Sequence, residues 1–441
     1  MGRPRLSELG DIGGGTMTST GQIDENESGV ASEPLRRNRD FVLLWSANFT
    51  STLGAQVSSL AYPLIALDLT GSAVQAGLIG SAGIVTHIVF RLPAGALVDR
   101  WNRRRTMLTC DLVRAGMLLA IIATLISGLL NFWMLLGATV ISGACAVFFH
   151  PAEISALRRI VPTDRLPQAF AQNEARDHAA TIAGPSLGGL LYGLGQVVPF
   201  VGQLLAYFFS FLAILMIRTP MDVRRREGRG EERRSLFQDI VEGLRWTWGQ
   251  RMLRVMLLAA AGISLVFSAL TFGVIVIAKQ GGATSAEVGL MLGIAGVGGL
   301  LGALIAPRLM RFSPAFVILA VFWISAALIP LMAISPTISV IGPTLAAMLF
   351  LMPTANTILG AYQVAVTPDH LQGRVISSLA LIGSVATPVG PVAAGLIIER
   401  WGATEALLTI GLVMLIVAAG TTASRTIRRL PSLADAAHST T

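Results

Sequence analysis

GALVDRWNRRR, residues 95–105, places an aspartate and four arginines between two long apolar runs. The run before it reads VQAGLIGSAGIVTHIVFRLPAGALV over residues 74–98, and the run after it reads TMLTCDLVRAGMLLAIIATLI over residues 106–126. Each run is long enough to cross about 30 Å of hydrocarbon as a helix. Charges are costly inside a bilayer, so the stretch is expected to be a loop between two membrane-spanning helices.

Similar apolar runs recur along nearly the whole chain. The 441 residues are 53% hydrophobic and 13% charged, and the mean hydropathy is +0.67. A soluble protein carries about 25% charged residues. We therefore expect an all-α membrane protein with twelve transmembrane helices. The expected spans are residues 41–69, 73–98, 106–127, 132–157, 167–193, 197–217, 253–278, 285–306, 314–334, 337–366, 371–398 and 403–423.

Basic residues indicate which side of the membrane each loop occupies. If the N-terminus is cytoplasmic, only Lys279 and Arg400 fall on the opposite side. Cytoplasmic loops carry the excess of lysine and arginine in membrane proteins, so both termini are expected in the cytoplasm. The basic pI of 10.6 then reflects topology, and no nucleic-acid partner is expected.

The lysine and cysteine content excludes some classes of chemistry. Lys279 stands in Ala-Lys-Gln, whereas a Walker A loop needs Gly-Lys-Ser or Gly-Lys-Thr, so the chain encodes no P-loop ATPase. Uphill transport then has to use an ion gradient or an ATPase partner. Cys110 and Cys145 lie inside apolar runs and are expected to be packing residues, with no disulfide, metal or other cofactor.

The longest polar stretch away from the ends, residues 218–252, divides the chain. Residues 236–248 within it can form an amphipathic helix at the membrane surface. The first residues are polar, without the apolar region of a signal peptide. The expected parts are a disordered cytoplasmic tail over 1–35, an N-terminal six-helix half over 36–217, a cytoplasmic linker over 218–252, a C-terminal six-helix half over 253–424 and a cytoplasmic tail over 425–441.

The two halves repeat one another. VPTDRLPQ at 161–168 precedes GPSLGGL at 184–190, and VTPDHLQG at 366–373 precedes GPVAAGL at 390–396. The matching prolines lie at a constant offset of 206, and GALVDR at 95–100 has a counterpart, GALIAP, at an offset of 207. Parallel repeats are typical of a transporter architecture in which the substrate path lies between the halves near the membrane midplane.

These stretches resemble signatures of the major facilitator superfamily. GALVDRWNRRR resembles its loop 2–3 signature, Gly-x-Leu-x-Asp-Arg-x-Gly-Arg-Arg, and AGPSLGG at 183–189 resembles the fifth-helix signature of its drug:proton antiporters, Gly-x-x-x-Gly-Pro-x-x-Gly-Gly. RNRDFVLLW and LPQAFAQNEA resemble the enterobactin-exporter and macrolide-efflux-like group. The resemblance covers about residues 36–425 and implies two parallel six-helix repeats that alternate between inward-open and outward-open states.

Three positions depart from these signatures. Asn102 replaces the glycine after the aspartate–arginine pair, and a left-handed turn there is expected to be tolerated, because asparagine adopts it more readily than most residues. Ala180 replaces the first glycine of the fifth-helix signature, a change between small residues. The fourth-helix arginine that the family links to proton coupling is absent from LLGATVISGACA, residues 135–146.

The charged loop is expected to act as a conformational switch. A carboxylate at the end of the second span can pair with arginine and with the N-terminal end of a neighbouring helix, in one transport state only. The second half has Ala306 at the position of Asp99, so the switch would be asymmetric. For the arginines, and above all for Arg105, simple anchoring of the topology is the alternative. The expected switch residues are Gly95, Asp99, Arg100, Arg103 and Arg104.

Gly184, Pro185, Gly188 and Gly189 interrupt the fifth span. Small residues permit close approach of two backbones, and proline bends a helix. We expect the four residues to pack at the interface of the halves and to seal the path in one state. A proline kink without a transport role is the alternative.

Ionisable residues inside spans cost about 2.5–3.5 kcal/mol each at a helix centre, so those present are candidates for function. Asp111 and Arg114 are one helical turn apart and are expected to form a local pair. Glu153 lies near the cytoplasmic end of the fourth span and is expected to extend its carboxylate toward the cytoplasm.

Five ionisable residues are the candidates for proton coupling. One carboxylate would titrate during transport, either Asp177 or Glu174, and one arginine would be its counter-charge, either Arg91 or Arg176. His87 shares a helix face with Arg91 and completes the set. A static ion pair between helices is the alternative.

Polar and aromatic residues on the core helices of the resembled fold are the candidates for contact with substrate. They offer apolar surface with a few polar points, which suits an amphipathic or lipophilic molecule. Aromatic rings that face lipid are the alternative. The cavity candidates are Gln56, Phe148, Phe149, Phe267, Phe272 and Asn356.

These observations predict a secondary active transporter, not an enzyme, in a bacterial plasma membrane. It would export a hydrophobic or amphipathic small molecule, such as a drug, an antibiotic or a secondary metabolite, in exchange for protons, and would act as a monomer in the lipid bilayer. One proton crossing 100 mV releases about 2.3 kcal/mol, which sustains roughly a fiftyfold gradient of a neutral substrate. The alternatives are an importer of a small metabolite or peptide with the same fold, a non-transporting membrane sensor, and a membrane enzyme, for which no catalytic motif is present.

Overall fold

The computed structural model describes residues 34–98, 101–221, 245–367, 375, 379 and 382–428. Most of the two expected tails and of the expected linker, including residues 236–244 of the expected surface helix, lies outside these ranges. Within them the chain is helical, with short connections and no strand. The bounds are η1 (Leu35–Arg37), α1 (Arg39–Thr70), α2 (Ala73–Val98), α3 (Arg103–Ile126), α4 (Phe132–Ile160), η2 (Thr163–Arg165), α5 (Leu166–Leu194), α6 (Val198–Met216), α8 (Arg251–Gln280), α9 (Ser285–Leu309), α10 (Pro314–Ile334), α11 (Ile338–Val366), α13 (Val389–Trp401), α14 (Ala403–Ala423) and α15 (Arg425–Arg428).

Ten segments of the described chain are long and apolar enough to cross a membrane, one of them running from Ile382 through α13. Helices α1 and α5 have 32 and 29 residues and are also long enough. These twelve segments correspond to the twelve expected spans, but most of residues 371–381 of the expected span 371–398 lies outside the described residues. Both are less apolar than the others, because α1 is rich in small polar residues and α5 carries Glu174, Arg176 and Asp177.

Side-chain caps fix where several helices begin. At α9, Thr284 and Glu287 form a reciprocal capping box. At α3, Asn102 has extended backbone with φ −66°, and its side-chain oxygen accepts from the N–H of Arg105 at 3.0 Å. Asn102 therefore does not adopt the left-handed turn that asparagine was expected to tolerate here. The residue fits this position as an N-cap, a role for which asparagine is among the preferred residues.

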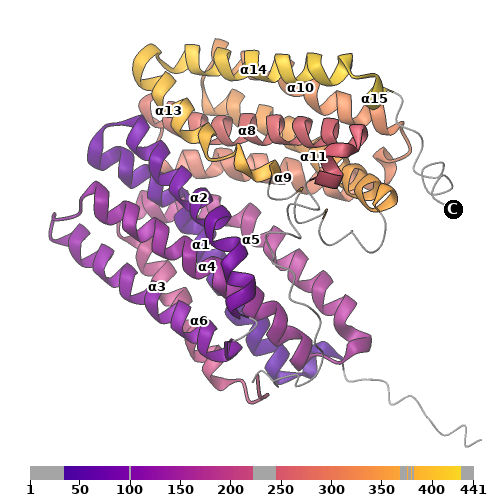
Figure 1. The fold of residues 1–441 in the computed structure, drawn as a ribbon. Coiled ribbons are helices and arrows are strands. Elements are labelled where there is room, and N and C mark those ends of the chain that lie inside the picture. The colour runs from indigo at the N-terminus through magenta and orange to yellow at the C-terminus, as the bar shows by residue number, and fades with distance from the viewer. Residues whose placement is uncertain are drawn as a thin grey trace, which may run out of the picture.

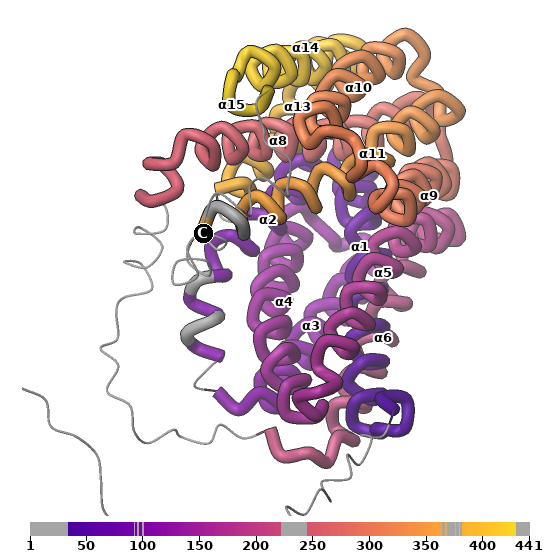
Figure 2. Tube along the Cα trace, turned by 90° about the vertical axis from the view of Figure 1, so that its right-hand side faces the viewer, coloured from indigo at the N-terminus to yellow at the C-terminus, as the bar shows by residue number. Residues whose placement is uncertain are grey.

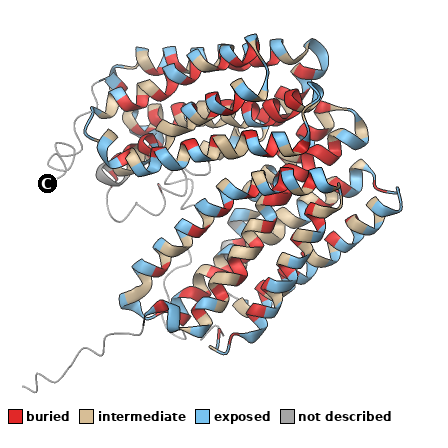
Figure 3. Ribbon diagram, turned by 180° about the vertical axis from the view of Figure 1, so that it is seen from behind, coloured by how far each residue is buried: buried red, intermediate tan, exposed pale blue. Residues whose placement is uncertain are grey.

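The helices form two bundles, α1 to α6 and α8 to α14 (Figure 1). The outer faces of both bundles are exposed along their length (Figure 3). On α3, the exposed Leu112, Leu119 and Ile126 recur every seventh residue, whereas Met107 and Leu118 are buried. An apolar stripe of this kind, facing away from the bundle, is suited to lipid contact.

The two bundles meet at one end and diverge toward the end at which α15 lies (Figures 1 and 2). Two pairs of helices make most of the described contacts between them, α5 with α9 and α2 with α13. These pairs form the two seams described below.

Candidate functional site

The α5–α9 seam is built from glycines. Gly189 lies so close to α9 that a Cβ on it would be 2.6 Å from the Cα of Gly289, a distance that real Cβ atoms essentially never show. Gly293, one turn further along α9, is covered by Ser186 of α5. The two helices therefore meet by direct backbone contact, which only small residues allow.

The repeat builds an equivalent α2–α13 seam. A Cβ on Gly395 of α13 would lie 2.5 Å from the carbonyl oxygen of Ala73, and one on Gly77 of α2 would lie 2.5 Å from that of Pro391. Gly395 follows Gly189 at the offset of 206 that relates the two halves. Each half thus closes on the other through the same position of its fifth helix.

Only part of the fifth-helix motif faces the other half. Gly189 does so, and the carbonyl oxygen of Pro185 lies 3.1 Å from the position of a Cβ on Gly289. Gly184 and Gly188 instead pack against α1 of their own half. This departs from the expectation that all four residues face the other half. The reason is that residues four apart share one helix face, and the 184–188 face points to α1.

A carboxylate crosses the α2–α13 seam. Glu399 Oε2 accepts hydrogen bonds from Ser72 Oγ at 2.9 Å and from the N–H of Val74 at 3.1 Å. The first N–H groups of a helix lack partners within the helix and carry the positive end of its dipole, so a carboxylate is favoured there. The equivalent residue of α5 is Gly193, so only one of the two seams has an acid at this position.

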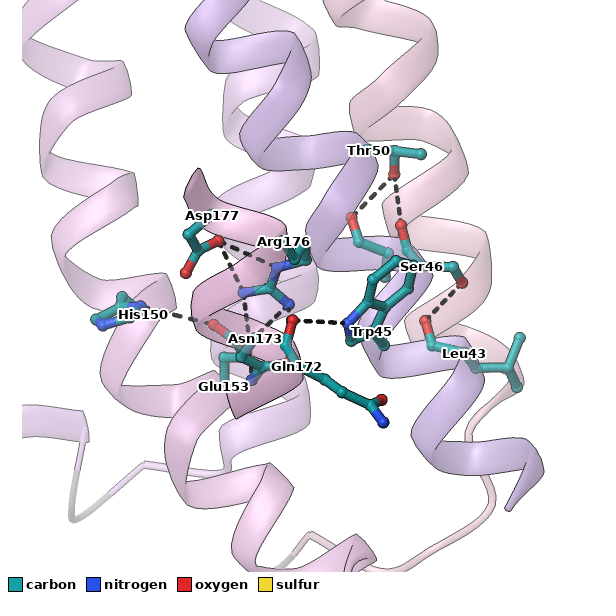
Figure 4. A network of polar contacts seen from close by, with 11 residues as sticks. Leu43, Trp45, Ser46, Thr50, His150, Glu153, Gln172, Asn173, Arg176 and Asp177 are labelled. Atoms are coloured by element: carbon teal, nitrogen blue, oxygen red, sulfur yellow. Dashed lines mark hydrogen bonds and ion pairs between the residues drawn. The ribbon is translucent and has the colours of Figure 1, made fainter. Parts of the chain in front are cut away.

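Polar side chains of α4 and α5 surround Arg176 (Figure 4). Its Nη1 lies 3.3 Å from Glu153 Oε1, and its Nη2 lies 3.0 Å from Asp177 Oδ1. Asn173 Nδ2 donates to Glu153 Oε1 at 3.4 Å, and His150 Nδ1 lies 3.6 Å from Glu153 Oε2. One guanidinium therefore compensates two carboxylates, and we call these five residues the Arg176 cluster.

The members of the Arg176 cluster differ in exposure. The side chains of Arg176 and Glu153 are 2% and 3% exposed, whereas that of Asp177 is 38% exposed. Glu153 does not extend toward the cytoplasm as expected, because its carboxylate is held by Arg176 within the helix packing. Asp177 is thus the acid of the cluster that is open to solvent.

Asp111 and Arg114 form the expected local pair, with 3.8 Å between Nη1 and Oδ1. Ser210 Oγ of α6 donates to Asp111 Oδ2 at 2.6 Å. The Arg114 guanidinium lies over the rings of Phe149 and Tyr207, 5.4 and 5.2 Å from their centroids. The pair is buried and joins α3 to α4 and α6. Its contacts are those of a pair that holds these helices together.

The remaining proton-coupling candidates lie outside the Arg176 cluster. Glu174 is exposed, and its carboxylate is 3.9 Å from a histidine of the same helix. His87 and Arg91 are exposed, one turn apart on α2, and neither forms an ion pair with any described carboxylate. Asp177 has Arg176, and not Arg91, beside it.

The four phenylalanine cavity candidates occupy different surroundings. Phe149 and Phe272 are 4% and 5% exposed and belong to the packed interior. Phe148 stacks on Trp101 with ring centroids 5.7 Å apart, beside α3. Phe267 is half-buried against the core of the C-terminal half. The structure therefore does not gather these rings into one common cavity.

The two polar cavity candidates also lie apart. Gln56 Nε2 donates to Thr181 Oγ1 at 2.9 Å and so joins α1 to α5. Asn356 is exposed and borders, with Ser264, a largely apolar cavity of about 170 Å³ among α8, α10 and α11. Asn356 is thus placed to contact a small apolar group within the C-terminal half.

The expected switch is described only in part. Asp99 and Arg100 lie outside the described residues, and at Gly95 only the helical backbone is described. Arg104 donates from Nη2 to a backbone carbonyl of α6. Arg103 Nε and Nη1 are buried without a hydrogen-bond partner in the described chain.

Glu153 and Glu399, two of the acids in the contacts described above, were not predicted from the sequence as site residues. Glu153 and its partner in α5 are 23 residues apart, a separation with no recognisable pattern. Glu399 stands next to Arg400 at the end of a span, which is typical of any polar loop. The cost of burying an acid was the only signal available for Glu153.

Residues 44–377 match the family model described as Major Facilitator Superfamily. The chain belongs to this superfamily. Its all-helical fold is that of major facilitator proteins, a family of transporters and not of enzymes.

Several characterised members of the superfamily are similar over nearly their whole length. The chain is 29% identical over 396 residues to the multidrug efflux pump Tap of Mycolicibacterium fortuitum, covering 85% of this chain and 93% of that protein. It is 23% identical over 401 residues to macrolide efflux protein A of Streptococcus pyogenes, covering 86% and 94%. Among solved structures, a bacterial homologue of the human lysosomal transporter Spinster, inward-facing and unoccupied, aligns with a TM-score of 0.69 at 16% identity, covering 90% of this chain and 98% of that one.

Proposed function

We propose that this chain is a proton-coupled efflux transporter of the bacterial cell membrane, which carries hydrophobic or amphipathic small molecules outward by alternating access. The observation that supports efflux most strongly is the similarity to multidrug efflux pump Tap over 93% of that protein's length. The similarity therefore extends over both halves of an efflux pump and is not limited to one shared motif.

Alternating access is supported by the way the halves meet. Both seams lie at the end away from the termini, where backbone contact closes the path, and the bundles diverge at the other end (Figure 2). The excess of arginine on the termini side supports a cytoplasmic orientation for that side. The conformation is then inward-open, and the two glycine seams, with Gly189 and Pro185 in one of them, form its outer seal.

Proton coupling is assigned to the Arg176 cluster. Asp177 and Glu153 share one guanidinium, and Asp177 is the solvent-open member. In the inward-open state Asp177 releases its proton to the cytoplasm and pairs with Arg176. In the outward-open state it is protonated from outside, which weakens its hold on Arg176, while Glu153 keeps the guanidinium compensated. Substrate and proton then move in opposite directions.

The cytoplasmic switch is assigned to Gly95, Asp99, Arg100, Arg103 and Arg104. Buried donors without partners are costly, and Arg103 presents two of them in the inward-open conformation. A carboxylate such as Asp99 would satisfy these donors once the cytoplasmic ends of the halves approach each other. The switch would therefore stabilise the outward-open state.

Transport in membrane vesicles tests this function. Inside-out vesicles with an acidic lumen, supplied with a fluorescent lipophilic dye or a macrolide, are expected to accumulate it, and a protonophore is expected to abolish the accumulation. An Asp177→Asn variant that inserts normally is expected to lose the effect of the pH gradient. Accumulation that ignores the gradient would contradict antiport, and accumulation by right-side-out vesicles would indicate an importer.

A further inference from the structure

One arginine inside the spans of the N-terminal half has no anionic partner. Arg91, Arg114 and Arg176 are the three arginines of this half that lie away from helix ends. The last two pair with carboxylates of their own or of a neighbouring helix. Within the described chain, Arg91 forms neither an ion pair nor a hydrogen bond. A permanent charge at membrane depth is costly, and one that is retained without a partner points to a ligand.

Arg91 continues a helix face that lines a recess in the N-terminal half. Gly83 and His87 of α2 border this recess, a cavity of about 250 Å³ enclosed by α1, α2, α4 and α6. Arg91 follows His87 by four residues and therefore lies on the same face, one turn nearer the end at which the bundles diverge. Ala146 of α4 borders the recess from the other side, and His150 follows it by one turn. Arg91 and His150 thus both lie beyond the recess, toward the end at which the bundles diverge.

The lining of the recess is mostly apolar with several polar side chains, and no described acid is among them. Two of its polar atoms, Tyr62 Oη and Gln203 Oε1, are buried and have no hydrogen-bond partner in the described chain. A buried polar atom is normally hydrogen-bonded to protein, water or ligand. The hydrogen-bonding lining residues are Ser59, Tyr62, His87, Thr139, Ser142 and Gln203.

The charged groups near His87 are basic. The groups that act on His87 are Arg91, His150 and Arg114, all of them basic. The two carboxylates of the Arg176 cluster are already engaged by its guanidinium. Arg91 is therefore an uncompensated cation one helical turn beyond His87, the last residue of α2 that borders the recess.

We propose that Arg91 and His87 form an anion-binding subsite, which holds the carboxylate or sulfonate of an amphipathic organic anion while its apolar body lies between the halves. The inference rests on the proposed efflux function and adds amphipathic anions to the neutral molecules of its substrate class. A guanidinium binds such a group through paired, charge-assisted hydrogen bonds. A hydroxyl or amino group on the part of the molecule that enters the recess would face Gln203 and Tyr62, which line it. The same chemistry would hold the phosphate of an anionic lipid.

Two fluorescent probes that differ by one charge test this subsite. The anionic probe is 8-anilinonaphthalene-1-sulfonate, and the neutral one is N-phenyl-1-naphthylamine, which has the same ring system without the sulfonate. Binding to purified full-length protein in maltoside detergent is measured at equilibrium, without a pH gradient. Arg91→Gln is expected to weaken binding of the sulfonate about tenfold to a hundredfold, the usual range for loss of a charged hydrogen bond. Binding of the neutral probe is expected to change less than about twofold.

Matched variants separate local from general charge effects. Arg308→Gln removes an exposed arginine of α9 in the other half and is expected to leave both affinities unchanged. Arg91→Lys keeps the charge but loses the paired geometry, and it is expected to restore part of the sulfonate affinity. Competition by phosphatidylglycerol, but not by phosphatidylcholine, would show that the subsite also accepts a lipid anion.

Three results would overturn the subsite: equal weakening of both probes in Arg91→Gln, equal weakening of the sulfonate in Arg308→Gln, or no sulfonate binding by the natural chain. These results leave the proposed function standing, because gradient-driven accumulation of the neutral dye is read separately in vesicles. Conversely, loss of the gradient effect there leaves the equilibrium comparison of the two probes intact.

Discussion

Gly189 in the N-terminal half and Gly395 in the C-terminal half occupy equivalent positions, and each lets its helix touch the backbone of the other half. Arg176 and Asp177 lie about two turns before Gly184, the first residue of the fifth-helix glycine motif, and the same offset of 206 gives Ile382 and Gly383. The halves are thus alike where they close on each other and different where they carry charge.

This difference separates two tasks. Movement needs two bundles that meet and part symmetrically, and the repeat supplies this with small residues. Coupling to protons needs a group that titrates, and one set is enough. In the described spans of the C-terminal half, charged residues lie only near helix ends, whereas the N-terminal half buries Asp111, Arg114, Glu153 and Arg176.

The largest effect, on stability, is expected from removing the arginine at the centre of the Arg176 cluster. Arg176→Ala leaves Glu153 buried without its partner, and removal of one member of a buried pair typically costs about 3–5 kcal/mol. The purified variant should unfold at a clearly lower temperature or denaturant concentration. Arg308→Ala, at an exposed position of the C-terminal half, should stay within about 0.5 kcal/mol of the natural chain. Equal losses in both variants would show that the Arg176 cluster is not specially stabilising.

The next largest effect is expected at the seams, where the halves are alike. A valine at position 189 cannot avoid the backbone of Gly289, and one at position 395 cannot avoid the carbonyl of Ala73. Gly189→Val and Gly395→Val should therefore each reduce transport more than about tenfold, because the closed outer end costs several kcal/mol to form. Labelling of cysteines placed in the path should show more access from outside.

Gly193→Ala is the matched control for the seam variants, because its nearest neighbour would be 3.5 Å from the new Cβ, an ordinary contact. It should keep near-normal transport. Tolerance of valine at position 189 but not at position 395 would contradict the equivalence of the two seams.

A smaller effect is expected where one seam has an acid and the other does not. Glu399→Gln keeps an acceptor for Ser72 and Val74 but loses the attraction between charge and helix dipole, worth about 0.3–1 kcal/mol. Outward opening should become about twofold to fivefold easier, measured as faster labelling from outside. Glu405→Gln, an exposed acid that does not cross a seam, should change nothing. If the two variants behave alike, the contact across the seam has no role in holding it closed.

The smallest effect is expected at Asn356, a neutral polar residue of the C-terminal half. Asn356→Ala removes one neutral group from the wall of a small apolar cavity, and a neutral hydrogen bond contributes about 0.5–1.5 kcal/mol net. The KM for a lipophilic substrate should change less than about tenfold, with coupling to protons intact. Loss of proton coupling in this variant would move the coupling site out of the N-terminal half.

The sequence predicted the spans and the repeat well because both depend on local signals. Apolar runs of spanning length mark helices, and the boundaries of α2, α10 and α14 coincide with the expected spans. Which face of a helix looks where depends on packing. Gly184, for example, faces α1, whereas Gly189 of the same helix faces α9. Phe149 lies beneath the Arg114 guanidinium, whereas Phe148, the residue before it, stacks on Trp101.

The charge network was predicted in its parts but not in its pairing. Asp177 and Arg176 were candidates because buried charge is costly, but the choice between Arg91 and Arg176 needs the distance between α2 and α5. Asp111 and Arg114 could be paired in advance because they lie one turn apart on one helix. Partners on different helices, such as Glu153 and Arg176, become visible only in the packed structure.

The most direct measurement is proton movement driven by substrate. Natural chain and Asp177→Asn are reconstituted into proteoliposomes that contain a pH indicator, and a gradient of N-phenyl-1-naphthylamine is imposed. We expect substrate flux through the natural chain to drive protons in the opposite direction, and Asp177→Asn, reconstituted at equal density, to drive none. Equal proton movement in both preparations would contradict the assignment of coupling to the Arg176 cluster.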